Sequence, residues 1–328
     1  MTSFVGNTAA IEAFLTASMG GTLHHAWLIA GPEGVGKARF ARAAALRLLA
    51  DAAAPGTLPP GLEIPEGSRT AAMIAAGAHP DYREMRRLPK DADKPDQDLA
   101  RSIPIAQVRA LQPMLATKPS MSERRVILID SIDDLERPGA SNALLKNLEE
   151  PPGGTIFLLV SHAPGRLLPT IRSRCRLLRF DPLSDGEVAT VLRAGLPDAT
   201  AGEVDALVRA GAGSPGRALR FAGLDLGGLE EELAAIARDG DPSNGRRVRL
   251  AKSLGAKSAQ PRYEAFLERV PAFIAERARE MVGAGLKDAL DAYDAARDLG
   301  RASLAQSLDA TTTAFEMGGL VARLAPRR

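Results

Sequence analysis

Cysteine and aromatic residues are scarce in this sequence. Its 328 residues include a single cysteine, Cys175, and aromatic side chains make up only 4% of the chain. A lone cysteine excludes an internal disulfide and a cysteine-rich zinc site. The core must therefore be built from alanine, leucine, valine and isoleucine. The hydrophobic content of 45% and the length are ordinary for a globular protein of two or three domains.

The sequence also lacks a strong net charge and any long apolar run. The formal net charge is +2, so nucleic acid would be contacted only through a local patch or a larger assembly. No apolar segment approaches the length that spans a membrane. The N-terminal segment MTSFVGNTAA has no basic stretch followed by an apolar one, which disfavours a signal peptide. We therefore expect a cytoplasmic protein with no membrane partner.

Short apolar runs alternate with segments of helical periodicity over the first 180 residues. Strands are expected at residues 25–30, 82–86, 126–130, 156–160 and 176–180, and helices at 7–17, 38–50, 70–76, 104–116 and 140–150. This alternation predicts an α/β domain with a mostly parallel sheet. Residues 51–101 are rich in proline, glycine, aspartate and alanine, and predict an irregular or partly mobile insertion.

Only helical patterns follow a break at Asp181 and Pro182. They cover residues 184–196, 201–210, 217–221, 246–254, 261–282, 286–298 and 302–324. A second break lies at residues 239–245, which are rich in aspartate and glycine. We therefore predict three domains, namely the α/β domain at 1–180, a small helical domain at 181–240 and an all-α C-terminal domain at 241–328.

The segment GPEGVGK matches the phosphate-loop pattern G-x-x-x-x-G-K. Its glycines, Gly31, Gly34 and Gly36, would let backbone amides turn inward around phosphate oxygens, and Lys37 would reach the terminal phosphates. The next residue is Ala38, where the motif needs a hydroxyl to bind magnesium. Two interpretations stay open, either weak ATP binding or a loop that survives only as a structural turn.

The strand expected at 126–130 ends in an acidic residue, as a Walker B strand does. Asp130 would hold magnesium through water, although it is also compatible with a buried strand that ends in a capping aspartate. An active ATPase has a glutamate next, to orient the attacking water, whereas this chain has Ser131, which cannot act as a base at neutral pH. Because Ala38 and Ser131 both lack the required group, we expect the chain's own ATPase activity to be weak or absent.

Three arginines occur at alternate positions, Arg172, Arg174 and Arg176. If this run is extended, their side chains share one face and repel each other unless an anion lies opposite. A phosphate group of a neighbouring subunit would satisfy them. The alternative is a solvated basic edge that discourages aggregation.

A longer motif resembles a known family. Residues 141–152, SNALLKNLEEPP, are similar to a signature of the bacterial clamp-loader ATPases, and so are LHHA at 23–26, HPD at 79–81 and SRC at 173–175. The resemblance covers about residues 5–225 well and the rest only by length and helical character. It implies an AAA+ fold, in which an α/β P-loop domain is followed by a small helical lid and a C-terminal helical collar that packs a pentameric ring.

The resemblance also implies roles for two arginines. Arg174 matches the finger that reaches the ATP of a neighbouring subunit. Arg217, in the segment GSPGR, matches the sensor arginine of the lid and would contribute to the nucleotide site, although an ordinary surface arginine is compatible with the same pattern. Ser161 and His162 lie where a further sensor is expected. Relatives often carry a four-cysteine zinc module that this chain lacks, and His79 alone cannot replace it, so no zinc is expected.

Within the family, motor subunits keep threonine and glutamate where this chain has Ala38 and Ser131. The resemblance thus implies an accessory subunit of the DNA polymerase III clamp-loader complex, which helps load the sliding clamp on primed DNA beside the gamma/tau and delta subunits. Nucleotidyl transfer would belong to the holoenzyme and not to this chain. The alternatives are an active AAA+ motor ATPase, of the gamma/tau kind or for repair, and a free-standing nucleotide switch.

Overall fold

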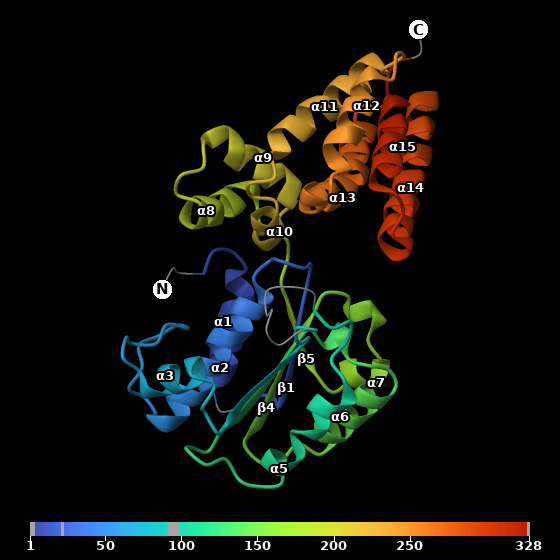
Figure 1. Cartoon of the computed structure of the whole chain (residues 1–328). Helices are drawn as coiled ribbons and strands as arrows, with labels where there is room; N and C mark the ends of the chain where they lie inside the picture. Colours follow the sequence, from blue (N-terminus) through green and yellow to red (C-terminus); the bar gives the residue numbers. More distant parts are fainter. Residues whose placement is uncertain (1–3, 21–22, 91–98, 327–328) are drawn as a thin grey trace. The chain divides into compact units, whose positions relative to one another are not determined.

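A computed structural model describes residues 4–20, 23–90 and 99–326, which form two compact units (Figure 1). The first unit reaches to Val188 and includes residues 213–216, and the second contains residues 189–212 and continues from Arg217. Residues 91–98 of the expected insertion lie outside the described residues. The division into three domains stays a prediction. Among the described residues, no helix is long and apolar enough to cross a membrane.

The first unit is built on a five-stranded sheet in the order β2-β3-β4-β1-β5. The strands are β1 (Ala26–Ala30), β2 (Tyr82–Arg86), β3 (Arg125–Asp130), β4 (Thr155–Ser161) and β5 (Arg176–Arg179). Every pairing among them is parallel, which confirms the expected fold class. Because Ala30 pairs with Ser161 and Asp130 with Val160, the carboxyl ends of the three central strands meet at one edge of the sheet.

Helices cover both faces of this sheet. They are α1 (Thr8–Met19), α2 (Lys37–Ala53), α3 (Arg69–Ala75), α4 (Ile105–Arg109), α5 (Gln112–Leu115), α6 (Gly139–Glu149) and α7 (Pro169–Arg172). On one face Leu28, Ile127 and Phe157 join the cluster that contains the buried residues of α4 to α7. On the other face Trp27 packs edge-on against Phe14 of α1, at 5.1 Å between ring centroids. The alternation of side chains along each strand thus separates two apolar layers.

The prediction of one helix at 104–116 is wrong, because this segment forms two short helices, α4 and α5. Pro113 lies in the first turn of α5 and has no N–H to donate to the preceding turn. The N–H of Leu111 instead bonds the carbonyl of Val108, three residues back. The two short helices still bury Val108 and Leu115 on the face that the periodicity predicted.

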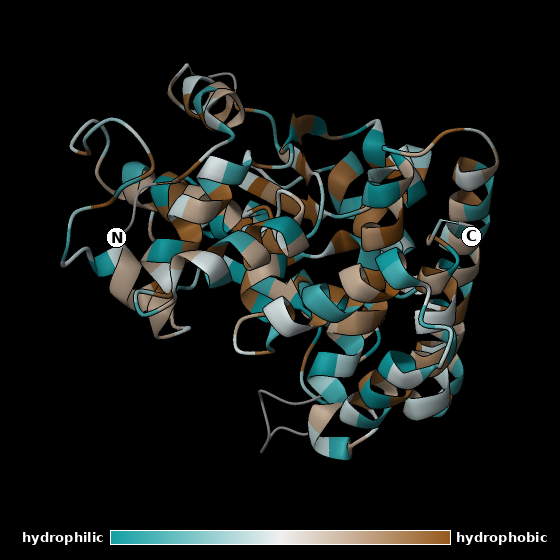
Figure 2. Cartoon of the chain, turned by 90° about the horizontal axis from the view of Figure 1, so that it is seen from above, coloured by the Kyte–Doolittle hydropathy of each residue, from teal (hydrophilic) through white to brown (hydrophobic). Residues whose placement is uncertain are grey.

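Helices make up the second unit. The helices that follow β5 are α8 (Asp185–Gly195), α9 (Ala201–Gly211), α10 (Pro215–Arg220), α11 (Leu226–Asp239), α12 (Gly245–Leu254), α13 (Gln260–Ala278), α14 (Gly283–Gln306) and α15 (Ala310–Ala322), and α8 and α10 cross the boundary between the units. Figure 2 shows hydrophilic and hydrophobic residues on the same helices, as amphipathic packing requires.

Two features of these helices differ from expectation. Helix α11 was not anticipated, because its first turn contains two glycines, yet Asp225 caps that turn by accepting the N–H of Gly228 at 3.2 Å. The last break lies at residues 307–309 and not near Gly300. Gly300 continues α14, whereas Ser307 adopts a left-handed conformation and Asp309 caps α15.

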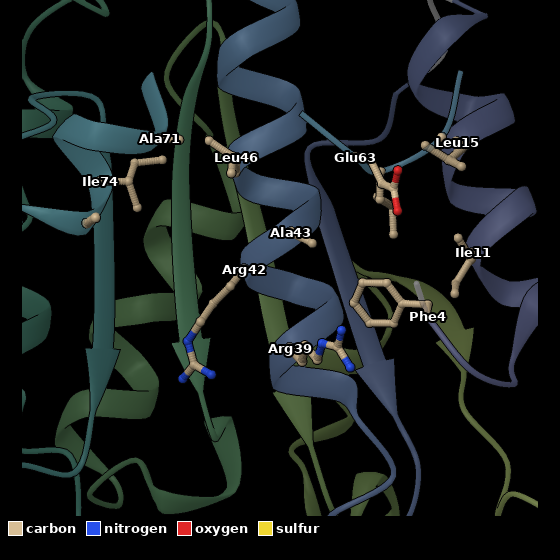
Figure 3. A pocket seen from close by; sticks show the side chains of 13 residues that line it. Phe4, Ile11, Leu15, Arg39, Arg42, Ala43, Leu46, Glu63, Ala71 and Ile74 are labelled. Carbon is tan, nitrogen blue, oxygen red and sulfur yellow. The ribbon is translucent and has the colours of Figure 1, made fainter. Parts of the chain in front are cut away.

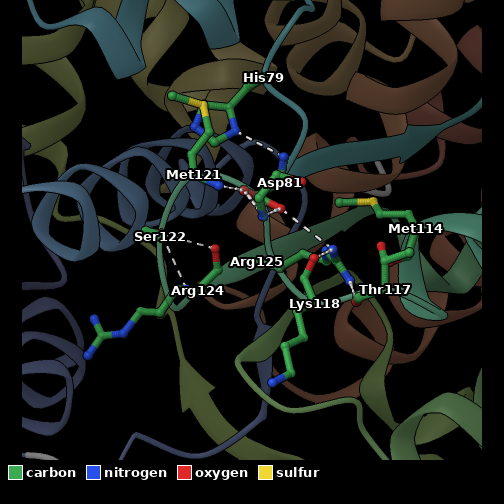
Figure 4. Close-up of polar contacts among 10 residues, drawn as sticks. His79, Asp81, Met114, Thr117, Lys118, Met121, Ser122, Arg124 and Arg125 are labelled. Atoms are coloured by element: carbon green, nitrogen blue, oxygen red, sulfur yellow. Dashed lines mark hydrogen bonds and ion pairs between the residues drawn. The ribbon is translucent and has the colours of Figure 1, made fainter.

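A buried ion pair links the residue before β2 to the start of β3 (Figure 4). The carboxylate of Asp81 accepts two backbone N–H groups of the loop 117–121 at 2.8 Å and lies 3.5 Å from the guanidinium of Arg125. Arg125 donates to two carbonyl oxygens of the same loop, at 3.0 and 3.1 Å. The ring of His79 accepts the N–H of Asp81. Both charged side chains are almost fully buried, so each depends on the other.

Asp81→Ala should lower the free energy of unfolding by about 3–5 kcal/mol, because it leaves the Arg125 guanidinium buried without its counter-charge. Denaturant titration of the whole chain measures the change. Asp298→Ala, which removes an exposed pair with Arg301 on α14, is the control and should have no measurable effect. Equal stabilities of the two variants would contradict the anchoring role of Asp81.

Candidate functional site

The phosphate-loop motif lies between β1 and α2, as its spacing predicted. Gly31 must be glycine, because a Cβ atom there would lie 2.0 Å from the carbonyl oxygen of Phe180. Gly34 and Gly36 have φ angles of 79° and 100°, which favour glycine. Gly36 is the N-cap of α2, so the first amides of that helix follow the loop directly.

The Lys37 ammonium group is hydrogen-bonded to the phosphate loop itself. Its side chain is almost fully buried, and Nζ donates to the carbonyl oxygen of Gly31 at 2.7 Å and to that of Pro32. Burial lowers the pKa of Lys37 to about 8, although the carboxylates of Asp133 and Glu33 act in the opposite direction. The cation that would contact terminal phosphates is therefore bonded to the loop's own carbonyl groups.

Residues 213–216 rest on the loop within the same unit. The N–H of Gly216 donates to the carbonyl of Gly34 at 2.9 Å, and the hydroxyl of Ser214 donates to the carbonyl of Glu33 at 2.7 Å. A Cβ atom on Gly216 would lie 2.9 Å from the Cα atom of Gly34. The sequence suggested this segment only for its arginine, and Gly216 was the available signal of a close backbone approach.

Arg217 lies in the second unit. Its Nε atom is 3.2 Å from a carboxylate oxygen of Glu268, and its guanidinium lies 5.8 Å from the ring centroid of Phe221. These contacts position the side chain within its own unit. Its role as a sensor of nucleotide stays a prediction.

The carboxylate of Asp130, the candidate Walker B residue, is held by an arginine that sequence reasoning missed. Nη2 of Arg42 lies 2.9 Å from Oδ2 of Asp130 and 2.7 Å from Oε1 of Glu84. The hydroxyl of Tyr82 donates to Glu84 at 2.9 Å. Figure 3 shows Arg42 projecting from α2. The available signal was its position four residues after Ala38, on the same face of the helix.

This cluster shifts the affinity of its members for protons. The hydrogen bond from Arg42 to Glu84 raises the pKa of Arg42, more than burial lowers it. For Glu84, burial acts to raise the pKa, but the hydrogen bond and the positive charge of Arg42, together with the hydrogen bond from Tyr82, lower the pKa overall. The guanidinium and the Glu84 carboxylate therefore stabilise each other in their charged forms.

The acidic residues beyond Asp130 have other partners. Asp133 accepts the hydroxyl of Ser161 at 3.0 Å and the N–H of His162 at 2.6 Å, so it organises the turn after β4. Asp134 accepts the hydroxyl of Ser131 at 3.3 Å and lies 3.1 Å from Nε of Arg87. Each carboxylate is thus engaged by neighbouring groups of the chain and is not presented as a substitute for the catalytic glutamate.

The run from Arg172 to Arg176 is not extended, so the prediction that these arginines share one face is wrong. Arg172 ends α7, Arg174 follows in a turn and Arg176 begins β5. Arg174 forms an ion pair with Glu149 at 2.7 Å and donates to the carbonyl of Thr170 at 2.8 Å. The guanidinium of Arg176 lies over the Trp27 ring, 5.1 Å from its centroid. Two of the three cations therefore have separate partners.

Two clefts of the first unit differ in character. A cleft of about 500 Å³ has mainly apolar walls from α1, α2 and α3, including Ile11, Leu15 and Ile74 (Figure 3). A second cleft of about 970 Å³ borders the phosphate loop at Gly31 and Pro32. Within the described ranges, no three histidine, cysteine or acidic side chains are grouped so as to hold a metal ion. Burial raises the pKa of Cys175 to about 12, so its thiol stays protonated.

The comparisons with known proteins decide the family. The family described as DNA polymerase III, delta subunit, matches residues 6–184, more than half of the chain. The chain belongs to this family. This match includes the SNALLKNLEEPP motif and confirms the resemblance to DNA polymerase III subunits that the motif indicated.

Individual relatives share part of their length with this delta-family chain. It is similar to the DNA polymerase III subunit delta′ of Pseudomonas aeruginosa, with 36% identity over 68% of this chain and 62% of that protein. It is also similar to the subunit delta′ of Bacillus subtilis, with 35% identity over 49% of this chain and 43% of that protein. The chain therefore spans less than two thirds of either relative. A DNA polymerase III gamma subunit-related protein from Thermotoga maritima superposes with a TM-score of 0.46, at 16% identity over 95% of this chain and 98% of that one.

The lowered pKa of Lys37 predicts a specific pH dependence of stability. Between about pH 8 and 10.5 the unfolded chain binds more protons at this lysine than the folded chain does, so stability rises with pH. Relative to Lys37→Met, the wild type should gain about 1 kcal/mol per pH unit near pH 9. Lys252→Met, at an exposed lysine of α12, should keep the wild-type profile. Denaturant titrations across this range measure the difference, and parallel profiles of wild type and Lys37→Met would refute the assignment.

Proposed function

We propose that this chain is an accessory subunit of the DNA polymerase III clamp loader, which helps load the sliding clamp on primed DNA. The observation that carries the proposal is the state of Asp130, the candidate Walker B carboxylate, which is paired with Arg42 in a chain whose residue 38 is an alanine without a hydroxyl. A site built in this way is poorly suited to hydrolyse ATP. Family membership supports the same assignment.

In this proposal the partners are the gamma/tau motor and delta subunits, and clamp and DNA are reached through the complex. Residues 1–180 act as an ATPase-like domain, 181–240 as the lid and 241–328 as the collar that joins the ring. ATP binds weakly to the loop that contains Lys37, or the loop is vestigial, and Arg217 acts as the lid sensor.

The contribution to catalysis is made in trans by Arg174. Its side chain is one-third exposed, and α6 and α7 position it through Glu149 and the carbonyl of Thr170. An arginine that stabilises charge on the transferring phosphoryl group accelerates related reactions by roughly 10³–10⁵. To reach the nucleotide of a neighbour, Arg174 must leave Glu149, whose carboxylate is half-exposed and so holds the guanidinium weakly.

Arg174→Ala should lower ATP turnover at the site that it completes by at least roughly 10³, while the ring still assembles. ATP turnover is measured in the reconstituted complex with clamp and primed DNA. Total turnover should fall only in part, because the other ATPase sites of the complex stay intact. Size-exclusion chromatography checks assembly.

Glu149→Gln is the matched variant, because it removes the same ion pair but keeps the arginine. It should retain wild-type turnover or exceed it. If both variants lowered turnover equally, Arg174 would serve only to position α6, and the finger assignment would fail.

The motor alternative is tested with the purified chain alone. We expect no turnover, with or without primed DNA. Robust turnover that disappears in Lys37→Ala would identify a motor ATPase instead.

A further inference from the structure

A single nitrogen atom bridges two carboxylates at the carboxyl edge of the sheet. Nη2 of Arg42 contacts Oε1 of Glu84, at the middle of β2, and Oδ2 of Asp130, at the end of β3. Nε of Arg42 adds a further hydrogen bond to Glu84 at 3.1 Å. About one-fifth of each carboxylate side chain is exposed, so one guanidinium offsets part of the charge of two carboxylates at a partly buried site.

A divalent cation at a phosphate loop depends on oxygen ligands from these same positions. Magnesium is held there by the hydroxyl of the residue after the lysine and by the aspartate that ends the Walker B strand. Ala38 supplies no oxygen, and the nearer oxygen of Asp130 is bonded to a guanidinium, which has only N–H donors. The residues of this chain therefore do not fit a magnesium ion.

The position of Arg42 explains how one side chain meets both carboxylates. It lies one turn after Ala38 on the same face of α2. β2 and β3 are neighbouring parallel strands, with Glu84 opposite Leu128 and Arg86 opposite Asp130. Glu84 and Asp130 are thus on the same face of the sheet, two positions apart in register.

We propose that the Arg42 guanidinium takes the place of the divalent cation at this phosphate loop, so that no divalent cation binds at Asp130 and any affinity for phosphate is independent of magnesium. The side chain is a fixed positive charge that neither dissociates nor responds to chelators. The replacement concerns the isolated chain and does not depend on clamp loading. Measurements of ATPase activity in the ring and of cation binding to the isolated chain can therefore contradict one proposal without contradicting the other.

Binding of Mn²⁺ alone, followed by electron paramagnetic resonance, tests the replacement. The wild type should bind no Mn²⁺ that depends on Asp130. Arg42→Ala should gain a site, because two carboxylate oxygens that shared one nitrogen are then free to share a cation. The double variant Arg42→Ala with Asp130→Asn should lose the site again.

Matched variants keep the test decisive. Arg42→Lys retains the positive charge at this position and should remain unable to bind Mn²⁺. Circular dichroism checks folding, and Arg42→Gln, which keeps an N–H donor on a shorter, uncharged side chain, replaces the alanine variant if that one unfolds. A wild-type Mn²⁺ site that Asp130→Asn abolishes, or a folded neutral variant that gains none, overturns the proposal.

The affinity of the wild type for ATP, compared in Mg²⁺ and in EDTA, is a second test. The wild type should bind ATP equally, within about twofold, in Mg²⁺ and in EDTA, and equality at the detection limit also agrees with the proposal. Binding that is tenfold or more tighter in Mg²⁺ overturns it.

Discussion

The register of the parallel sheet is the constraint on which the candidate site depends. Because Ala30 lies opposite Ser161 and Asp130 opposite Val160, three loops leave the sheet at the same edge. The phosphate loop, Asp130 and the turn bound by Asp133 are therefore neighbours. A shift of one residue would turn Asp130 to the opposite face, away from Arg42.

The sequence predicted most of the sheet and the phosphate loop, because these depend on local patterns. β2 was expected at residues 82–86 and has those bounds, and the glycines of the loop have the positive φ angles that their motif requires. Local pattern failed where tertiary contacts decide. The sequence was interpreted as two helices separated near Gly300, yet α14 continues through Gly300 and the chain turns only at Ser307.

The contacts within the site were harder to predict than its residues. The pairing of Arg42 with Asp130 requires α2 to cover the sheet face on which both Asp130 and Glu84 lie, and neither spacing nor composition contains that information. The prediction that alternate arginines share a face was wrong for a related reason. A short helix before Arg174 turns the chain, so alternate residues do not share a face. Strand order and helix packing are long-range properties, whereas motifs are local ones.

The pair formed by Asp81 and Arg125 has a topological consequence. It fastens the start of β2 to the loop before β3, and the two strands are hydrogen-bonded along their whole length. The chain between them leaves the sheet at the carboxyl end of β2 and returns at the amino end of the neighbouring strand β3. A proteolytic cut between β2 and α4 would therefore leave both fragments attached to the same sheet, and the nicked protein would keep its fold.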